Sequence, residues 1–127
     1  MPHFLLSAEA MFSAAHTLPG VDMCERMHGH NWRVRVTVRV EADALEDGMG
    51  VDFRTVEHVT RGAVAGFEHR YLNDLPDFAE RRPTAETIAM VICERVAQAL
   101  EVRAPTSRIS EVELWEMPQY RVVYRPA

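Results

Sequence analysis

Cysteine is scarce in this chain, which has only Cys24 and Cys93 among its 127 residues. Two cysteines cannot build the disulfide framework of a small secreted domain, and in a reducing compartment even one stabilising disulfide is not expected. Cys93 falls within the apolar periodicity of an expected helix, so we predict that its thiol is packed in the core. Cys24 fits no such pattern and is taken up below with the histidines.

Long apolar runs and an excess of positive charge are missing as well. No stretch approaches the roughly 18 to 20 apolar residues of a membrane span, and the N-terminus lacks the pattern of a signal peptide. We therefore expect a cytoplasmic protein with no membrane partner. The formal net charge of −5 argues against a nucleic-acid-binding surface as the main role of the fold, so no nucleic-acid partner is expected either.

The composition that remains is that of an ordinary globular domain, with 47% hydrophobic and 26% charged residues, and the length suits a single domain over residues 1–127. Strict alternation predicts a half-buried strand over residues 32–41, whose polar side carries Arg33, Arg35 and Arg39. That side would be left in water or be covered by neighbouring subunits. Further strands are expected over residues 3–14, 109–116 and 120–125, helices through residues 56–67 and 88–100, a turn with Asp47-Gly48 at its tip, and a polar loop over residues 70–83.

The order of these elements is two strands, two helices and two strands. Because the strands are grouped by hairpins and the helices lie together in the middle, the order favours an α+β domain. We expect an antiparallel sheet with both helices packed on one face. Thr84 is predicted to cap the second helix, and Glu86 falls in its first turn, where a negative charge suits the helix dipole.

Three histidines form the most informative pattern of the chain. His28 and His30 are two residues apart, next to a predicted strand, and in an extended backbone such side chains point to the same side. Together with His16, they supply three imidazoles, which fill three corners of a zinc tetrahedron and leave the fourth open for water or substrate. The pattern predicts a zinc site, although these ligands also suit other divalent ions.

Cys24 lies four residues before His28 and leaves two interpretations open. As a fourth ligand, it would close the site and favour a structural zinc in a binding module. As a separate thiol near a metal, it would have a lowered pKa and serve as a base toward a substrate.

Two further carboxylates stand out. Glu68 precedes His69, and a carboxylate that orients an imidazole raises its basicity, although a surface helix end explains the pair equally well. Glu116 interrupts an apolar alternation at the end of a predicted strand, where an inward carboxylate is costly unless it is paired or binds a ligand. Its two oxygens suit the guanidine-like edge of a pterin or guanine, and the alternative is a strand-end side chain that reaches water.

Six short segments carry a family likeness across nearly the whole chain. They are residues 12–16 (FSAAH), 24–32 (CERMHGHNW), 51–53 (VDF), 69–74 (HRYLND), 83–86 (PTAE) and 114–116 (LWE). In this order they resemble the family of 6-pyruvoyl-tetrahydropterin synthase and 6-carboxy-tetrahydropterin synthase. The resemblance implies the tunnelling fold, in which a four-stranded antiparallel sheet carries two helices on one face. It also implies that three subunits close a barrel and that two trimers stack into a homohexamer.

The resemblance further implies a role for each motif. The three histidines would hold Zn²⁺, and Cys24 would be a catalytic base instead of a ligand. Glu68 and His69 align with an aspartate-histidine pair of the family, and Glu116 aligns with the glutamate that anchors the pterin. Thr84 and Glu86 match the segment beside the pterin pocket.

The implied substrate is 7,8-dihydroneopterin triphosphate. Zinc would act as a Lewis acid toward the substrate side chain while Cys24 and His69 move protons. The carboxy-forming branch releases acetaldehyde and triphosphate on the way to queuosine and other 7-deazapurines. The short spacing between Cys24 and His28 favours this branch over the pyruvoyl-forming enzymes, which tend to have a longer gap.

Three residues depart from the family pattern: Glu68 stands where aspartate is usual, Met117 follows Glu116 where threonine is common, and Glu25 follows Cys24. A glutamate at the position of Glu25 is linked to members that cleave the side chain of dihydroneopterin to give 6-hydroxymethyl-dihydropterin. The alternatives are therefore such a lyase, a 6-pyruvoyl-tetrahydropterin synthase, or a non-catalytic pterin-binding zinc protein.

Overall fold

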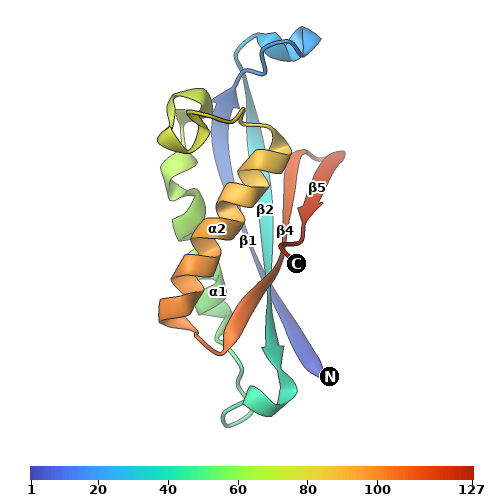
Figure 1. Ribbon diagram of the computed structural model, residues 1–127, viewed down its shortest axis with the longest axis vertical. Coiled ribbons are helices and arrows are strands. Elements are labelled where there is room, and N and C mark those ends of the chain that lie inside the picture. The colour runs from blue at the N-terminus through green and yellow to red at the C-terminus, as the bar shows by residue number, and fades with distance from the viewer.

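Two long antiparallel strands form the centre of the protein (Figure 1). The structure, a computed structural model, describes residues 1–127 except for the side chains of Asp22 and Met23. Strand β1 (His3–His16) pairs with β2 (His28–Glu41) without interruption, from His3 opposite Glu41 to His16 opposite His28. The other elements are β3 (Arg70–Tyr71), β4 (Ser107–Met117), β5 (Tyr120–Tyr124), α1 (Phe53–Val64), α2 (Ala85–Arg103) and five short 3-10 helices, η1 (Asp22–Glu25), η2 (Ala42–Ala44), η3 (Ala65–Phe67), η4 (Leu72–Asp74) and η5 (Pro76–Phe78).

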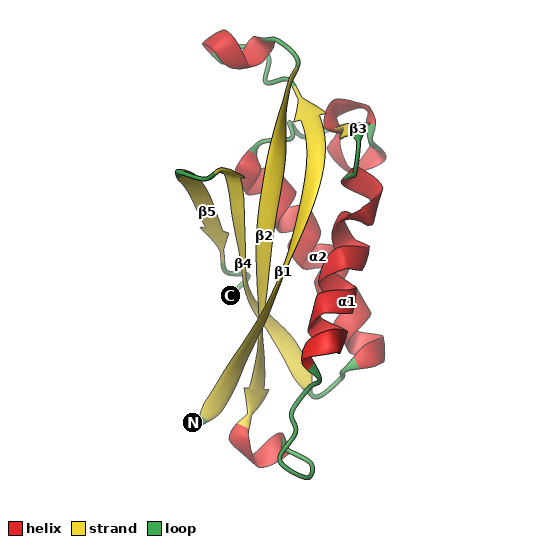
Figure 2. Cartoon of the chain, turned by 180° about the vertical axis from the view of Figure 1, so that it is seen from behind, coloured by secondary structure: helices red, strands yellow, loops and turns green.

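The sheet has the strand order β3-β1-β2-β4-β5, and both helices cover one of its faces (Figure 2). The long strands are all antiparallel, as predicted. The expected four strands are joined by a fifth, β3, which runs parallel to β1 and pairs only Arg70 and Tyr71 with Ala14 and Ala15. The prediction of a plain loop over residues 70–83 was wrong at this point, because two residues are too few to produce an alternating pattern.

Both central strands extend further toward the histidines than the apolar pattern indicated. Strand β1 ends at His16 instead of residue 14, and β2 begins at His28 instead of Trp32. The segment before Trp32 is polar, so hydrophobic alternation cannot detect it, although it is fully paired. This extension places all three histidines on regular strand backbone.

The core lies between the sheet and the helices. The inward side chains of β2 are completely buried, and the apolar stripe of α2 packs over them. Cys93 is 4% exposed and belongs to this core, as predicted. The hydroxyl oxygen of Thr84 accepts a hydrogen bond from the backbone N–H of Thr87 at 3.1 Å, which confirms the predicted helix cap.

The other face of the sheet carries paired charges. Glu9 accepts hydrogen bonds from Arg33 and Arg35, each at 2.9 Å, and the nearly buried Glu113 accepts from Arg35 at 3.0 Å and from Arg121 at 3.1 Å. These arginines therefore stand in ion pairs with carboxylates of neighbouring strands.

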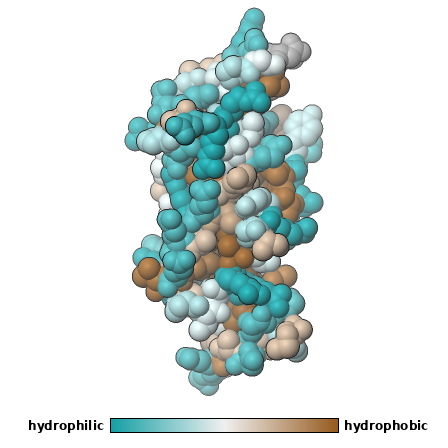
Figure 3. Space-filling model, in the orientation of Figure 1, coloured by the Kyte–Doolittle hydropathy of each residue, from teal (hydrophilic) through white to brown (hydrophobic). Residues whose placement is uncertain are grey.

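The connection between the central strands contains η1 and lies at one end of the molecule (Figure 1). At the other end, Asp47 and Gly48 both have positive φ and form the tip of the predicted turn, closed by backbone bonds between Glu46 and Met49. On the face shown in Figure 3, hydrophobic residues form separate groups among hydrophilic ones. In the part of the chain that is described, no helix is both long and apolar enough to cross a bilayer.

Candidate metal and substrate site

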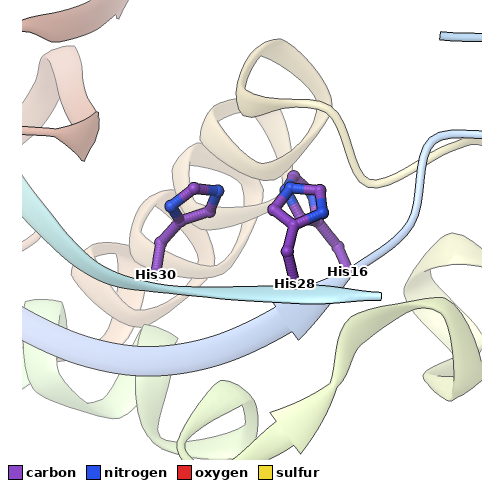
Figure 4. A group of neighbouring side chains, drawn as sticks. All are labelled: His16, His28 and His30. Carbon is purple, nitrogen blue, oxygen red and sulfur yellow. The ribbon is translucent and has the colours of Figure 1, made fainter. Parts of the chain in front are cut away.

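The three predicted histidines converge at one end of the sheet (Figure 4). His16 is the last residue of β1 and lies directly opposite His28, the first residue of β2, while His30 follows on the same side of that strand. One ring nitrogen from each residue lies within 4.8 Å of the other two. Strand pairing, and not a flexible loop, therefore brings the three imidazoles together.

Backbone carbonyls fix the orientation of two of the rings. Nδ1 of His16 donates to the carbonyl oxygen of Pro83 at 2.8 Å, and Nδ1 of His28 donates to that of Arg26 at 2.7 Å. Because a carbonyl only accepts, Nδ1 carries the proton in both neutral rings and Nε2 keeps its lone pair. This is the arrangement in which metal-binding histidines are usually held.

The nitrogens that face one another have no hydrogen-bond partner in the described structure. Nε2 of His16 and Nε2 of His30 are both buried and unpaired. A buried polar atom without a partner costs free energy, which coordination of a cation would remove. The donor set thus fits a divalent metal that binds imidazole, with zinc as the first choice.

Burial also favours the protonation state that a metal requires. Desolvation lowers the pKa of His16, which is fully buried, and lowers that of His30. Both rings are therefore kept neutral at pH 7, and only neutral imidazole can donate a lone pair to a metal. Trp32 forms the adjoining wall, with its ring edge-on to His16 and His30 at centroid distances of 5.2 and 5.3 Å.

Glu116 faces the histidines from the neighbouring strand β4. Its carboxylate oxygens lie 3.5 Å from Nε2 of His30 and 3.9 Å from Nε2 of His16, and the side chain is 24% exposed. The side chain is thus turned toward the site and is still reached by solvent. A carboxylate in this place can bind a hydrogen-bond donor of a ligand that sits over the three imidazoles.

Cys24 lies in the connection between β1 and β2 and is partly buried. Its sulfur does not belong to the group of mutually close ligand atoms, which contains the three histidines alone. The connection is held by its own backbone, with the N–H of Leu18 bonded to the carbonyl of Cys24 at 2.7 Å. The carboxylate of Glu25 accepts a hydrogen bond from the N–H of Gly20 at 3.0 Å, so this side chain also stabilises the connection.

Glu68 and His69 contact each other, and neither belongs to the group of close ligand atoms formed by the three histidines. Oε1 of Glu68 is 3.2 Å from Nε2 of His69 and accepts from the N–H of Ser13 at 3.1 Å. The longer side chain of glutamate therefore still reaches the imidazole. His69 is 83% exposed and has a φ of 57°, an unusual backbone conformation for a non-glycine residue.

The pair lies beyond the outer edge of β1, where the N–H of His69 donates to the carbonyl of Ser13 at 2.7 Å. His69 lines a hollow of about 440 Å³ together with Ser13 and Asn31. Successive side chains of a strand point to opposite faces, so Ser13 and Asn31 point away from the side on which His16 and His30 meet. His30 also lines this hollow, although no hydrogen bond or ion pair between Glu68 or His69 and the three imidazoles is found among the described contacts.

Thr84 and Glu86 lie at the start of α2, directly after Pro83. The hydroxyl of Thr84 donates to the hydroxyl of Thr87 at 3.0 Å as well as accepting its N–H, so its hydrogen is already used. Glu86 is exposed in the first turn. The carbonyls of Pro83 and Arg26, which orient the imidazoles, were not predicted, because every residue has a carbonyl and its use leaves no mark in the sequence.

Comparison with known proteins agrees with this geometry. The family described as 6-pyruvoyl tetrahydropterin synthase matches residues 5–127. The chain belongs to this family. A 6-carboxy-5,6,7,8-tetrahydropterin synthase of Bacillus subtilis is 32% identical over 130 residues, which cover 97% of this chain and 86% of that protein. A dihydroneopterin monophosphate aldolase of Pyrococcus furiosus is 34% identical over 113 residues, which cover 89% of this chain and 90% of that protein.

The solved structure of 6-pyruvoyl tetrahydropterin synthase from Caenorhabditis elegans has the same fold. It superimposes with a TM-score of 0.83 at 22% identity and covers all of this chain and 98% of its own. The predicted tunnelling fold is thereby confirmed, with the short β3 added to its four antiparallel strands. Membership of the 6-pyruvoyl tetrahydropterin synthase family also confirms the prediction of an enzyme, a lyase of the pterin synthase type.

Proposed function

We propose that this protein is a zinc-dependent 6-carboxy-5,6,7,8-tetrahydropterin synthase. Its substrate would be 7,8-dihydroneopterin triphosphate, and its products 6-carboxy-tetrahydropterin, acetaldehyde and triphosphate, in the route to queuosine and other 7-deazapurines. The observation that carries the proposal is the pair of buried, unpaired Nε2 atoms of His16 and His30 beside a third imidazole. The relative from Bacillus subtilis that bears this enzyme name supports the choice of reaction.

In this proposal, His16, His28 and His30 hold the zinc ion. Zinc supplies Lewis acidity, which lowers the energy of negative charge that develops on the substrate side chain. The chain contributes the orientation of the ligands, since the carbonyls of Pro83 and Arg26 bind Nδ1 of His16 and His28 and would leave Nε2 of both rings available to the ion. With three ligands, one position remains for substrate or water.

Glu116 would anchor the pterin ring. Two adjacent N–H groups of a pterin match the two oxygens of a carboxylate, and a charge-assisted bond of this kind is stronger than a neutral one. Because Glu116 lies 3.5 Å from His30, a ring held by it lies beside the imidazole cluster. Glu86 and Thr84 would line the pocket from the start of α2.

Cys24 and His69 would move the protons, with Glu68 fixing the ring of His69. The high exposure of His69, whose imidazole contacts Glu68 alone among the described ion pairs, supports a site completed by another subunit. We accordingly propose a homohexamer built as a dimer of trimers. A single domain over residues 1–127 would be its repeating unit.

A lyase that yields 6-hydroxymethyl-dihydropterin is the second candidate. Glu25 beside Cys24 and the similarity to the dihydroneopterin monophosphate aldolase of Pyrococcus furiosus both favour it. The hydrogen bond from the N–H of Gly20 to the Glu25 carboxylate favours the first candidate, because it engages Glu25 in the loop, whereas the thiol of Cys24 has no hydrogen bond among the described contacts.

Product analysis separates the candidates. The zinc-loaded protein is incubated with 7,8-dihydroneopterin triphosphate, and the pterins and volatile aldehyde are identified by mass spectrometry. Acetaldehyde with a 6-carboxy pterin supports the first candidate, and a 6-hydroxymethyl pterin supports the lyase. A 6-pyruvoyl pterin would identify the pyruvoyl-forming enzyme, and binding of the pterin without any product would identify a non-catalytic zinc protein.

Two variants test the residue roles. Cys24→Ala should abolish turnover while zinc content stays at one ion per chain, and Cys93→Ala, which removes the core thiol, is the matched control that should keep both. Undiminished turnover in Cys24→Ala would remove that residue from the mechanism. His28→Ala should lose zinc, and full zinc content in that variant would disprove the ligand set.

A further inference from the structure

We propose that Asn73 is a positioning residue that holds His16 in place and thereby sets the affinity of the site for a divalent metal. The inference rests on the proposed function only in taking the three histidines as the ligand set. Asn73 itself lies in η4, outside the imidazole cluster, and has no contact with the cluster among the described bonds.

The side chain of Asn73 binds both backbone polar groups of Thr17, the residue that follows His16. Oδ1 accepts from the N–H of Thr17 at 2.9 Å, and Nδ2 donates to its carbonyl at 3.0 Å. The hydroxyl of Tyr71 adds a third bond at 2.7 Å, to Oγ1 of Thr17. All three bonds are partly buried, so water competes with them less than at an open surface.

These bonds begin where the backbone pairing of the sheet edge stops. The parallel ladder from β3 pairs with Ala14 and Ala15 and then ends, because the chain turns into η4. An amide side chain has the same donor and acceptor as a peptide group, so Asn73 continues the ladder by side chain at Thr17. On this edge of β1, the residues on both sides of His16 are consequently bonded.

His16 is thus held from three directions. Its backbone lies opposite His28 on one edge of β1, its neighbours are bonded to β3 and Asn73 on the other, and its ring donates to Pro83. Without Asn73, the strand would end on His16 with only one edge paired, next to the loop that carries Cys24. Zinc requires its ligands within tenths of an ångström of their ideal distances, so fraying of this residue would weaken binding.

A different result is expected if Asn73 only keeps residues 70–78 in place. Its loss would then lower the stability of the fold without a specific effect on the affinity for the metal. Leu75→Ala provides this comparison, because Leu75 lies in the same segment and packs against the core without any bond to Thr17. It loosens the segment by loss of apolar contact alone.

The test measures metal affinity and local backbone protection, not turnover. Zn²⁺ affinity is determined by competition with a chelator, the ligand geometry is followed through the visible spectrum of the Co²⁺ form, and hydrogen exchange of Thr17 is measured on metal-free protein. For Asn73→Ala, we expect up to roughly tenfold weaker Zn²⁺ binding, the lower end of the range for groups that bond a ligand directly, because Asn73 acts on His16 through the backbone of Thr17. Exchange at Thr17 should accelerate, and the Co²⁺ spectrum should change.

Asn73→Asp keeps the shape of the side chain and one acceptor but sets an oxygen against the Thr17 carbonyl. It should weaken Zn²⁺ binding as well, and it serves as the test if the alanine variant does not fold. Unchanged Zn²⁺ affinity despite faster exchange at Thr17 would overturn the inference. So would an equal loss of affinity in Leu75→Ala at an equal loss of thermal stability. His16→Ala separates the two proposals, since normal Zn²⁺ binding in that variant would refute the ligand set itself.

Discussion

Removal of the cap of helix α2 should lower the stability of the fold without a comparable loss of pterin binding. Thr84→Ala removes the hydroxyl that accepts the N–H of Thr87 at 3.1 Å, while the backbone bond from Ile88 to the carbonyl of Thr84 at 2.9 Å is kept. Loss of such a cap costs about 1 kcal/mol. For 127 residues, the entropy of unfolding is about 0.27 kcal/mol per kelvin, so the melting temperature should fall by about 4 °C.

The assay is thermal unfolding of the metal-free protein by circular dichroism, together with pterin binding measured well below the melting temperature. Thr84→Ser retains an accepting hydroxyl and is the matched control, with an expected change of less than about 1 °C, since serine caps helices as well as threonine does. The hydroxyl of Thr84 already donates its hydrogen to Thr87 and accepts the N–H of Thr87. Thr84 would therefore line the pocket without donating to the pterin, and pterin affinity in Thr84→Ala should stay within about twofold of the wild type. An unchanged melting temperature combined with a large loss of pterin affinity would refute this reasoning.

Three further predictions concern the site and the packing at the opposite end of the sheet. Burial lowers the pKa of His16 and His30 in the folded protein. At a pH between these lowered pKa values and the ordinary histidine pKa of about 6.5, the unfolded chain therefore binds more protons than the folded protein. The metal-free protein should therefore lose stability as pH falls below about 6.5, and urea midpoints that stay constant from pH 7.5 to 5 would contradict this. Glu116→Gln should weaken pterin binding by about tenfold or more in calorimetry, through loss of a charged acceptor, and equal affinity would remove Glu116 from the pocket. Gly50→Ala should lower the urea midpoint by the equivalent of about 1 to 3 kcal/mol, because an added Cβ would lie 2.7 Å from Cγ1 of the buried Val40; a midpoint equal to wild type would show that the turn shifts freely.

The sequence predicted those parts of the fold that burial makes periodic. The alternating valines of β2 and the apolar stripe of α2 are both buried as expected. It failed where pairing is not accompanied by apolar alternation, as in the polar start of β2 at His28 and in the two residues of β3. In these places, the backbone hydrogen bonds are made with neighbouring strands, and no local sequence pattern predicts them.

The same division applies to the candidate site. Histidines two residues apart on a strand must share a face, so His28 and His30 could be placed together from sequence, and His16 joins them through the register of β1. The groups that orient them could not be found in this way. The carbonyl of Pro83 and the amide of Asn73 lie 67 and 56 residues from their partners, His16 and Thr17, and only the folded chain brings them into contact.

Strand β1 runs from His3, at one end of the sheet, to His16 in the imidazole cluster at the other end. Its outer edge is occupied by β3 only at Ala14 and Ala15, and the stretch toward His3 offers unpaired peptide groups of the kind that recruit another strand. Any chain that docks along this stretch stiffens the strand whose last residue is His16. If the proposed hexamer forms along this stretch, dilution would loosen the proposed zinc ligand together with the assembly, and the affinity for the metal would then depend on the protein concentration.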